Sequence, residues 1–450
     1  MRAQFYRWIE ANSVMFINAG SLIGSTVITS GLGFGYWWLA ARLFSPESVG
    51  LASAIISAMM LLGTLGILGL NTLLVGELSR QPGSEFSLIS AALVLVGGVA
   101  GCFGVIFALT AHLLANDFQI LGASVVNIVL FTAGVSLTAI TLVLDQALMG
   151  LLQGQQQFWR NTVFAALKLV ALLVSGLYLQ HTTGLTIYTT WTIGNLLSLA
   201  VLAGFALHKN RGTRNVYRPQ WQLLRKLGFT AIKHHALNLT MLAPAQILPI
   251  VVTILLTATT NAWFYVSLSI ANLITMLPIA LTTVLYAESS AQPERLTYKM
   301  RVTLSLSFIL CALTIGLLWL LGGYLLSLFG TSYAEGALSS LRILSFEALP
   351  VTIRLHYVTI FRIRGQIGKA TLPFIAIGIF QLAGAITGAY LGGLTGLSFG
   401  WLITDCIGAL FLLPPISTTI FPPASDLHVE KGFLALPISH PRVLGKGPNK

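Results

Sequence analysis

The stretch Ser175–Leu185, with the sequence SGLYLQHTTGL, recurs in the second half of the chain as TGAYLGGLTGL at Thr387–Leu397. One constant displacement aligns identical residues of the two stretches: Gly176 with Gly388, Tyr178 with Tyr390, Leu179 with Leu391, and Thr183–Leu185 with Thr395–Leu397. Identities held in one register over this length indicate an internal duplication, with each copy about half of the chain long. In an apolar chain, so long a period is typical of two related bundles of membrane helices.

The composition excludes an ordinary soluble protein. Of the 450 residues, 55% are hydrophobic and only 8% are charged, and the mean hydropathy is +0.83. A soluble fold of this size needs a far more charged surface. Apolar runs of about 20 residues, the length that a helix needs to cross a bilayer, recur along the chain. The sequence therefore predicts an all-α integral membrane protein.

Twelve spans are predicted, arranged as two six-helix bundles. Their approximate ranges are 14–40, 49–75, 87–114, 125–151, 162–179 and 187–207 in the first half, and 236–258, 263–287, 302–329, 338–361, 370–391 and 394–417 in the second. Basic residues concentrate in alternate connections, beginning with Arg2 and Arg7. Because positively charged loops stay in the cytoplasm, both termini are predicted to be cytoplasmic. Two halves of the same orientation are related by a pseudo-twofold axis along the membrane normal.

The predicted organisation has four parts. These are an N-lobe at 1–207, a basic cytoplasmic linker at 208–235, a C-lobe at 236–417 and a cytoplasmic tail at 418–450. The linker interleaves basic and apolar residues, and two interpretations stay open: a short amphipathic helix on the inner membrane surface, or a loop whose charges set the orientation. The net charge of +12 is attributed to such segments, and no nucleic-acid partner is predicted.

Ionisable residues inside the spans are the candidates for function, because a charge at the centre of a spanning helix costs about 2.5–3.5 kcal/mol. The tenth span has the densest set, around Pro350. The cationic candidates for a substrate-binding cavity are Arg354, Lys168, Lys233, Arg42, Arg342 and His356. The candidates for a coupling-ion site are Glu347, Asp145 and Asp405.

Several of these residues also have a purely structural interpretation. Lys233 is placed to snorkel to the inner interface, and Arg42 to anchor the first span at the outer surface. Lys168 either snorkels inward or pairs with Asp145 on the neighbouring helix. Asp405 has no obvious partner nearby in the sequence, so its alternatives are a buried hydrogen bond or a neutral acid.

Motifs for enzymatic chemistry are missing from the sequence. It contains neither a phosphate-binding Gly-x-x-x-x-Gly-Lys-Ser/Thr loop nor a His-Glu-x-x-His or paired-cysteine pattern. Cys102, Cys311 and Cys406 lie inside apolar runs and are interpreted as packing residues. We therefore predict no cofactor and no metal. The predicted outer loops are short and hold few acids, which favours a carrier over an enzyme.

Three short elements carry a family resemblance: the turn ARLFSPESVGLA at Ala41–Ala52, the inner segment Tyr217-Arg-Pro followed by Leu227-Gly-Phe, and RIRGQ at Arg362–Gln366. Together with twelve spans in two halves, they resemble the multidrug/oligosaccharidyl-lipid/polysaccharide (MOP) flippase superfamily, and the last resembles its polysaccharide-exporter branch. The resemblance covers about residues 10 to 417.

This resemblance implies a flippase in the cell inner membrane. It would move a polyprenyl-diphosphate-linked oligosaccharide, such as a repeat unit of O-antigen, capsule or exopolysaccharide, from the inner to the outer leaflet by alternating access. Its partners would be this substrate, membrane lipids, and polymerase and glycosyltransferases of the same pathway. Arginine suits such a substrate because its guanidinium binds phosphate through two hydrogen bonds.

Two other functional classes are kept as alternatives. A cation-coupled multidrug exporter of the same fold should have an acidic and aromatic cavity, whereas buried bases are at least as numerous as acids in this sequence. A membrane-embedded sugar polymerase or ligase should carry a large outer loop with acidic and basic residues, and the predicted topology has no such loop.

Overall fold

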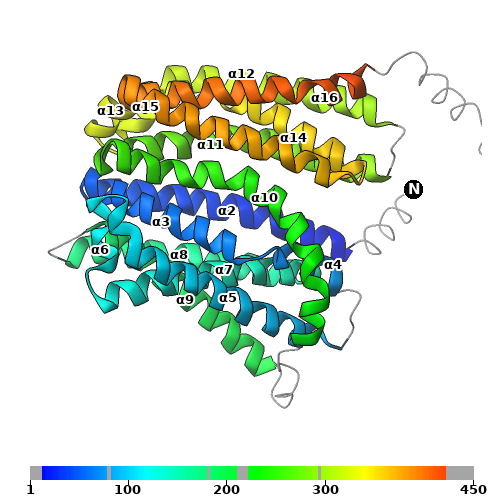
Figure 1. Ribbon diagram of the computed structural model, residues 1–450, viewed down its shortest axis with the longest axis horizontal. Helices are drawn as coiled ribbons and strands as arrows, with labels where there is room; N and C mark the ends of the chain where they lie inside the picture. The colour runs from blue at the N-terminus through cyan, green and yellow to red at the C-terminus, as the bar shows by residue number, and fades with distance from the viewer. Residues whose placement is uncertain (1–12, 79–82, 180–182, 210–220, 292–294, 422–450) are drawn as a thin grey trace, which may run out of the picture.

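The computed structural model describes residues 13–78, 83–179, 183–209, 221–291 and 295–421 (Figure 1). In this part of the chain all regular structure is helical, which confirms the predicted fold class. The long helices are α2 (Ser13–Leu43), α3 (Pro46–Gly66), α5 (Glu85–Thr110), α7 (Val125–Gly150), α8 (Gly154–Tyr178), α9 (Gly184–Lys209), α10 (Trp221–Leu255), α11 (Ala258–Ala291), α12 (Leu296–Ser327), α13 (Thr331–Ser345), α14 (Ala348–Ile363) and α15 (Ile367–Phe411). Shorter helices are α4 (Leu70–Glu77), η2 (Ala111–Leu113), η3 (Asn116–Phe118), α6 (Gln119–Gly122) and α16 (Leu413–Ile420).

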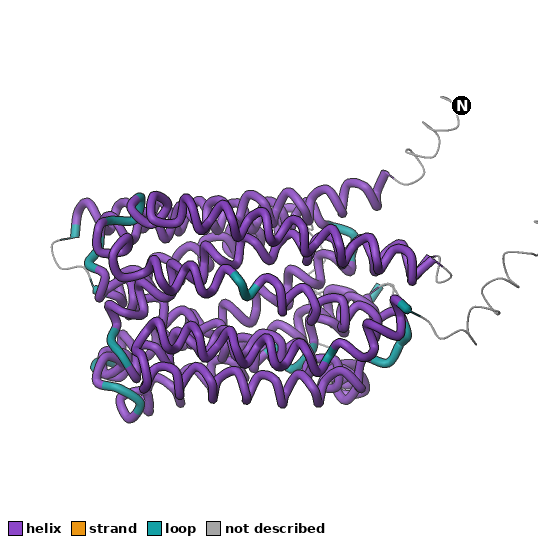
Figure 2. The backbone as a smooth tube through the Cα atoms, turned by 90° about the horizontal axis from the view of Figure 1, so that it is seen from above, coloured by secondary structure: helices purple, strands orange, loops and turns teal. Residues whose placement is uncertain are grey.

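Ten helical segments of the described chain are long and apolar enough to cross a membrane. The protein is therefore a multi-pass membrane protein, as predicted. Seen from above, the long helices run roughly side by side and are joined by short loops (Figure 2). The exact number of twelve spans and the cytoplasmic placement of the termini stay predictions.

One of these segments, α15, consists of two antiparallel arms. Its backbone leaves the helical region at Gly392 and Gly393, and Gly393 has a positive φ of 57°. Beyond this point the chain folds back, so that the backbone of Gly396 lies directly against that of Gly388. In a continuous helix these two residues would be about 12 Å apart. The reversal falls where the sequence predicts a break between two spans.

The predicted tenth span is not one continuous helix. It is divided between α13 and α14, and the break lies at Phe346 and Glu347. Pro350 lies in the first turn of α14. Proline has no N–H to donate to the preceding turn, and it is tolerated at the start of a helix far better than in its interior. The position of Pro350 therefore accounts for a new helix starting here.

The two halves of the chain repeat one packing pattern. In the N-half (α2–α9), α2 packs on α8, and α3 packs on α5 and α7. In the C-half (α10–α16), α10 packs on α15 in the same way, and α11 packs on α12 and α13. The repeated sequence stretches lie at corresponding connections, namely between α8 and α9 and at the reversal of α15. Figure 1 shows α4–α9 on one side of the molecule and α12–α16 on the other.

Helix α10 contacts both halves. It contains Pro244 and Pro249, and prolines inside a helix bend it because they remove backbone hydrogen bonds. The helix crosses the molecule obliquely in Figure 1, and it packs on α3, α4 and α5 as well as on α15. Residues 210–220 of the predicted linker lie outside the described residues, as does the tail from residue 422, whereas residues 221–235 form the start of α10.

Candidate functional site

A cavity of about 370 Å³ lies between the two halves. Residues of α2 line one wall and residues of α11 the other, at spacings of three or four that place them on one face of each helix. The lining residues are Ser30, Gly33, Phe34 and Trp37 from α2, Val266, Ser269, Asn272, Leu273, Thr275, Met276 and Ile279 from α11, and Phe329. All of them are uncharged.

Aromatic contacts between the halves close this cavity at one end. The rings of Trp37 and Tyr265 lie 4.6 Å apart between centroids, and those of Phe34 and Phe329 lie 5.3 Å apart, edge to face. Close by, Arg42 Nε donates to the carbonyl of Leu328 over 2.7 Å. We call this end the Leu43 end, because α2 ends there at Leu43.

A second contact at the Leu43 end joins α3 and α11. Asn261 Nδ2 donates to the carbonyl oxygen of Gly50 over 2.8 Å and lies 2.9 Å from Ser53 Oγ. Asn261 and Ser53 are fully buried. The backbone of Ala258 approaches Gly50 so closely that a Cβ there would overlap its carbonyl oxygen. The two halves are therefore in tight contact at this end.

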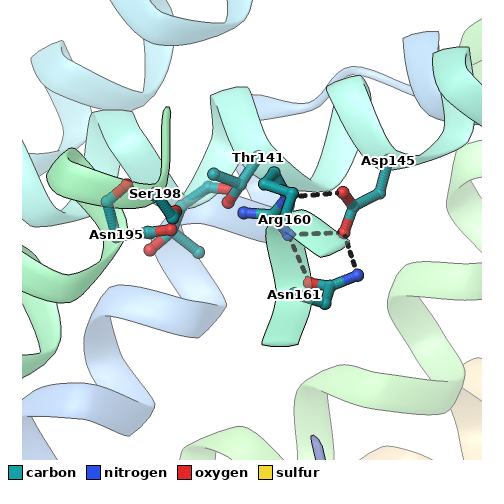
Figure 3. A network of polar contacts seen from close by, with 7 residues as sticks. Thr141, Asp145, Arg160, Asn161, Asn195 and Ser198 are labelled. Carbon is teal, nitrogen blue, oxygen red and sulfur yellow. Dashed lines mark hydrogen bonds and ion pairs between the residues drawn. The ribbon is translucent and has the colours of Figure 1, made fainter. Parts of the chain in front are cut away.

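A buried ion pair lies inside the N-half, in the network of Figure 3. Arg160 Nε donates to Asp145 Oδ1 over 2.9 Å, and its Nη2 donates to Asp145 Oδ2 over 2.7 Å. Asn161 contacts both residues. Arg160 is 5% exposed, and its Nη1 has no hydrogen-bond partner among the described residues. Asp145 thus pairs with Arg160 and not with Lys168, contrary to one of the two interpretations of Lys168.

Lys168 lies two turns further along α8, among aromatic rings. Its ammonium nitrogen is 3.6 Å from the ring centroid of Trp191, 4.8 Å from that of Phe164 and 5.0 Å from that of Tyr36. The side chain is only 4% exposed. Such rings attract a cation electrostatically, so Lys168 is held within the N-half with no carboxylate partner among the described residues.

These two cations lead to a stability prediction. Replacing Arg160 by methionine should lower the free energy of unfolding by about 3–5 kcal/mol, because Asp145 would be left as a buried charge without its partner. The double variant Arg160→Met with Asp145→Asn should recover most of this loss. Chemical unfolding of the purified protein in detergent measures both. Lys168→Met is the matched control on the same helix, and a loss as large as that of Arg160→Met would contradict the explanation.

A second charged cluster lies inside the C-half and connects α14 with α15. Arg354 Nη1 is 3.2 Å from Asp405 Oδ1, and Arg354 Nη2 is 4.0 Å from Glu347 Oε1. Asp405 is fully buried and accepts a hydrogen bond of 2.7 Å from Gln381. Asp405 therefore has the partners that the sequence did not reveal. We call Glu347, Arg354 and Asp405 the C-half triad.

The remaining candidates have structural contacts. Arg342 lies over the ring of Trp319, with its guanidinium carbon 5.3 Å from the centroid. His356 is fully buried and contacts the carbonyl oxygen of Thr352 at 2.8 Å. Lys233 lies in α10, but its side chain is outside the described part of the structure. In the described part, no group of three or more histidine, cysteine or acidic residues is arranged to hold a metal ion.

None of the eight predicted site residues with a described side chain lines the cavity between the halves. Arg42 is exposed and bridges the two halves at the Leu43 end. The other charges lie within the lobes, where opposite charges, backbone carbonyls or aromatic rings compensate for lost hydration. Sequence reasoning missed the lining residues because they are neutral. A usable signal was the spacing of Ser269, Asn272 and Thr275 in α11, which brings three polar groups to one side of an apolar helix.

The family model of the polysaccharide biosynthesis proteins matches residues 16–286, which is more than half of the chain. The chain belongs to this family. No curated protein sequence matches it.

Solved structures of several membrane transporters share the fold of this chain. An inward-facing multidrug resistance MATE-family transporter of the MOP superfamily has 17% identity and a TM-score of 0.66, with 88% of this chain and 96% of that chain covered. The lipid II flippase MurJ, in an inward closed conformation, has 16% identity and a TM-score of 0.65, with 91% and 90% covered. A MOP transporter from Pyrococcus furiosus, reported for a binding pocket of reverse polarity, has 16% identity and a TM-score of 0.56, with 90% and 96% covered. These structures confirm the fold that the predicted resemblance to the MOP superfamily implied.

Proposed function

We propose that the protein is a flippase that moves a polyprenyl-diphosphate-linked oligosaccharide from the inner to the outer leaflet by alternating access. The observation that carries this proposal is the family match over residues 16–286, together with a cavity between two duplicated halves that is closed at one end. In the predicted orientation, the Leu43 end faces away from the cytoplasm. The cavity would then receive its substrate from the cytoplasmic side.

Transport requires the contacts at the Leu43 end to break while the opposite end closes. The aromatic pairs and the Asn261 hydrogen bonds join residues of different halves, so such an exchange breaks contacts between the halves and keeps the packing within each lobe. A packed lobe moves as a rigid body, because interfaces switch between discrete arrangements more readily than cores deform.

The diphosphate group needs positive charge along its route, because transferring an ion from water to a medium of low dielectric constant costs of order 20 kcal/mol before relaxation. The described lining of the cavity contains no cation. Lys233 at the start of the α10 span and Lys168 behind the α2 wall stay our candidates for this role. Both would have to approach the head group in another conformation of the cycle.

We assign the coupling of transport to the C-half triad. Two carboxylates share one guanidinium there, and Asp405 Oδ2 has no hydrogen-bond partner among the described residues. With both acids ionised, the triad would hold one uncompensated negative charge in a buried place, which is costly. A proton or a small monovalent cation would remove that cost. Its uptake and release would bias the two conformations of the transporter.

A multidrug exporter of the same fold is the second candidate, favoured by the fold that the chain shares with MATE transporters. The neutral lining of the cavity is the argument against it, because a site for cationic drugs gains from a carboxylate. A membrane-embedded sugar polymerase or ligase is the third class. It would form glycosidic bonds and leave a product of altered length.

Reconstitution in liposomes tests these classes. Vesicles with the purified protein and a short polyprenyl-diphosphate-linked oligosaccharide should make the glycan accessible to an added glycosidase faster than protein-free vesicles do. Chromatography of the recovered lipid should show an unchanged chain length. Lengthened glycan would instead establish a polymerase. Efflux of cationic dyes without glycan movement would establish the drug exporter.

A further inference from the structure

The cavity between the halves combines aromatic surface with neutral polar groups. Trp37, Phe34 and Phe329 supply the aromatic surface at its closed end. Ser30, Ser269 and Asn272 supply polar groups from the two facing helices. Sites of this composition, mainly apolar with a few convergent polar groups, are typical of small-molecule recognition.

Three of the polar side chains that line this cavity are free to bind a ligand. Hydroxyls within an apolar helix normally bond to a carbonyl of the preceding turn, as Thr275 does to Asn272 over 2.7 Å and Thr282 does to Pro278 over 2.7 Å. No such bond is present in the described structure for the hydroxyls of Ser30 and Ser269 or for the carboxamide of Asn272. Together they offer donors and acceptors that a ligand with several hydroxyl groups would satisfy.

The same lining disfavours the other ligand classes. An acidic sugar would bring a carboxylate into a cavity whose described lining residues include no cation, and it would lose hydration without gaining a charged partner. A cationic drug would meet no carboxylate. An acyl or prenyl chain would leave three polar side chains without hydrogen bonds, each at a cost. Only a neutral polar ligand avoids all of these losses.

The volume of the cavity limits what it holds. About 370 Å³ is near the lower end of the range of roughly 300–1,000 Å³ for small-molecule sites. The cavity therefore accommodates a short segment of a glycan, and the remaining sugars and the lipid lie outside it. Aromatic rings suit such a segment, because the apolar faces of sugar rings pack on them while their hydroxyls reach the polar groups.

We propose that this cavity recognises an uncharged sugar unit of the lipid-linked glycan and discriminates against acidic sugars. The proposal rests on the proposed flippase function and adds the chemical class of its substrate. Asn272 is its principal specificity residue, because it is exposed to the cavity and carries both a donor and an acceptor.

The test compares two lipid-linked substrates of equal length, one built of neutral hexoses and one containing a uronic acid. In the liposome assay, the wild-type protein should expose the neutral glycan at least about tenfold faster than the acidic one. Asn272→Ala should slow only the neutral glycan, by about three- to tenfold, as expected for one lost hydrogen bond. Met276→Arg should raise the rate for the acidic glycan. Met276→Gln, of similar size without charge, is its matched control.

A binding experiment separates the sugar-site proposal from the flippase proposal. Calorimetry measures how the free neutral and acidic oligosaccharides bind to the detergent-solubilised protein. If the protein prefers the neutral oligosaccharide and Asn272→Ala loses this preference, the sugar site is supported. This holds even if no lipid-linked glycan is moved, and then only the flippase proposal fails. Equal movement of both lipid-linked glycans overturns the sugar site and leaves the flippase proposal standing. If Met276→Arg does not fold, Asn272→Ala and the comparison of substrates still decide the question.

Discussion

Replacing Arg354 by alanine should abolish transport and lower the free energy of unfolding by about 3–5 kcal/mol. The guanidinium of Arg354 lies between Asp405 at 3.2 Å and Glu347 at 4.0 Å. Asp405 lies in α15, and Glu347 lies at the break between α13 and α14. Removing it leaves two carboxylates facing each other in the core of the C-half, and breaking a buried ion pair by deleting one partner costs that much. Chemical unfolding in detergent and the liposome assay measure the two effects.

Three variants separate coupling from stability. Arg354→Lys should restore part of both properties, because it keeps the charge but loses the planar fork of donors. Asp405→Asn leaves one acid and one base, so it should stay folded yet lose the dependence of transport on an ion gradient. Glu347→Gln makes the same neutralising change at the other acid of the triad and serves as the matched control for Asp405→Asn. An Arg354→Ala protein with normal stability and transport would remove the triad from the mechanism.

Cross-linking the two halves at the Leu43 end should stop transport completely and reversibly. Ser53 and Asn261 are suited to this experiment, because Asn261 Nδ2 lies 2.9 Å from Ser53 Oγ across the interface. The native residues Cys102, Cys311 and Cys406 are first replaced by serine or alanine. A small oxidising reagent then joins Ser53→Cys to Asn261→Cys through a direct disulfide, and a reductant releases it.

Each single-cysteine variant treated with the same reagent serves as the control for modification alone. The loss should appear only in the double variant and disappear on reduction, because alternating access requires this end to open. Undiminished transport by a protein shown to be fully cross-linked would contradict the proposed cycle. It would leave the fold assignment and the sugar site unaffected.

The sequence was sufficient to establish the type of molecule. Apolar runs and the scarcity of charge show that the chain crosses the membrane. Each charged residue in hydrocarbon adds its own cost, so this property can be judged from the sequence. The duplicated stretches at Ser175–Leu185 and Thr387–Leu397 lie at corresponding connections of the two halves. The pairing of Asp145 with Arg160 was also within reach, because these residues lie at similar distances on either side of the turn between α7 and α8.

The tertiary structure alone decided which charges meet and which residues line the cavity. Arg354 and Asp405 are brought together by the packing of α14 on α15, and the sequence distance between them hides their contact. The uncharged face formed by α2 and α11 depends on how each helix is rotated about its axis. That rotation is set by close packing between helices, for example where Gly50 contacts Ala258. The residues that determine it are therefore remote from one another in the sequence. Hydropathy and periodicity are local properties, and therefore they determine the helices but not the surface that the helices enclose.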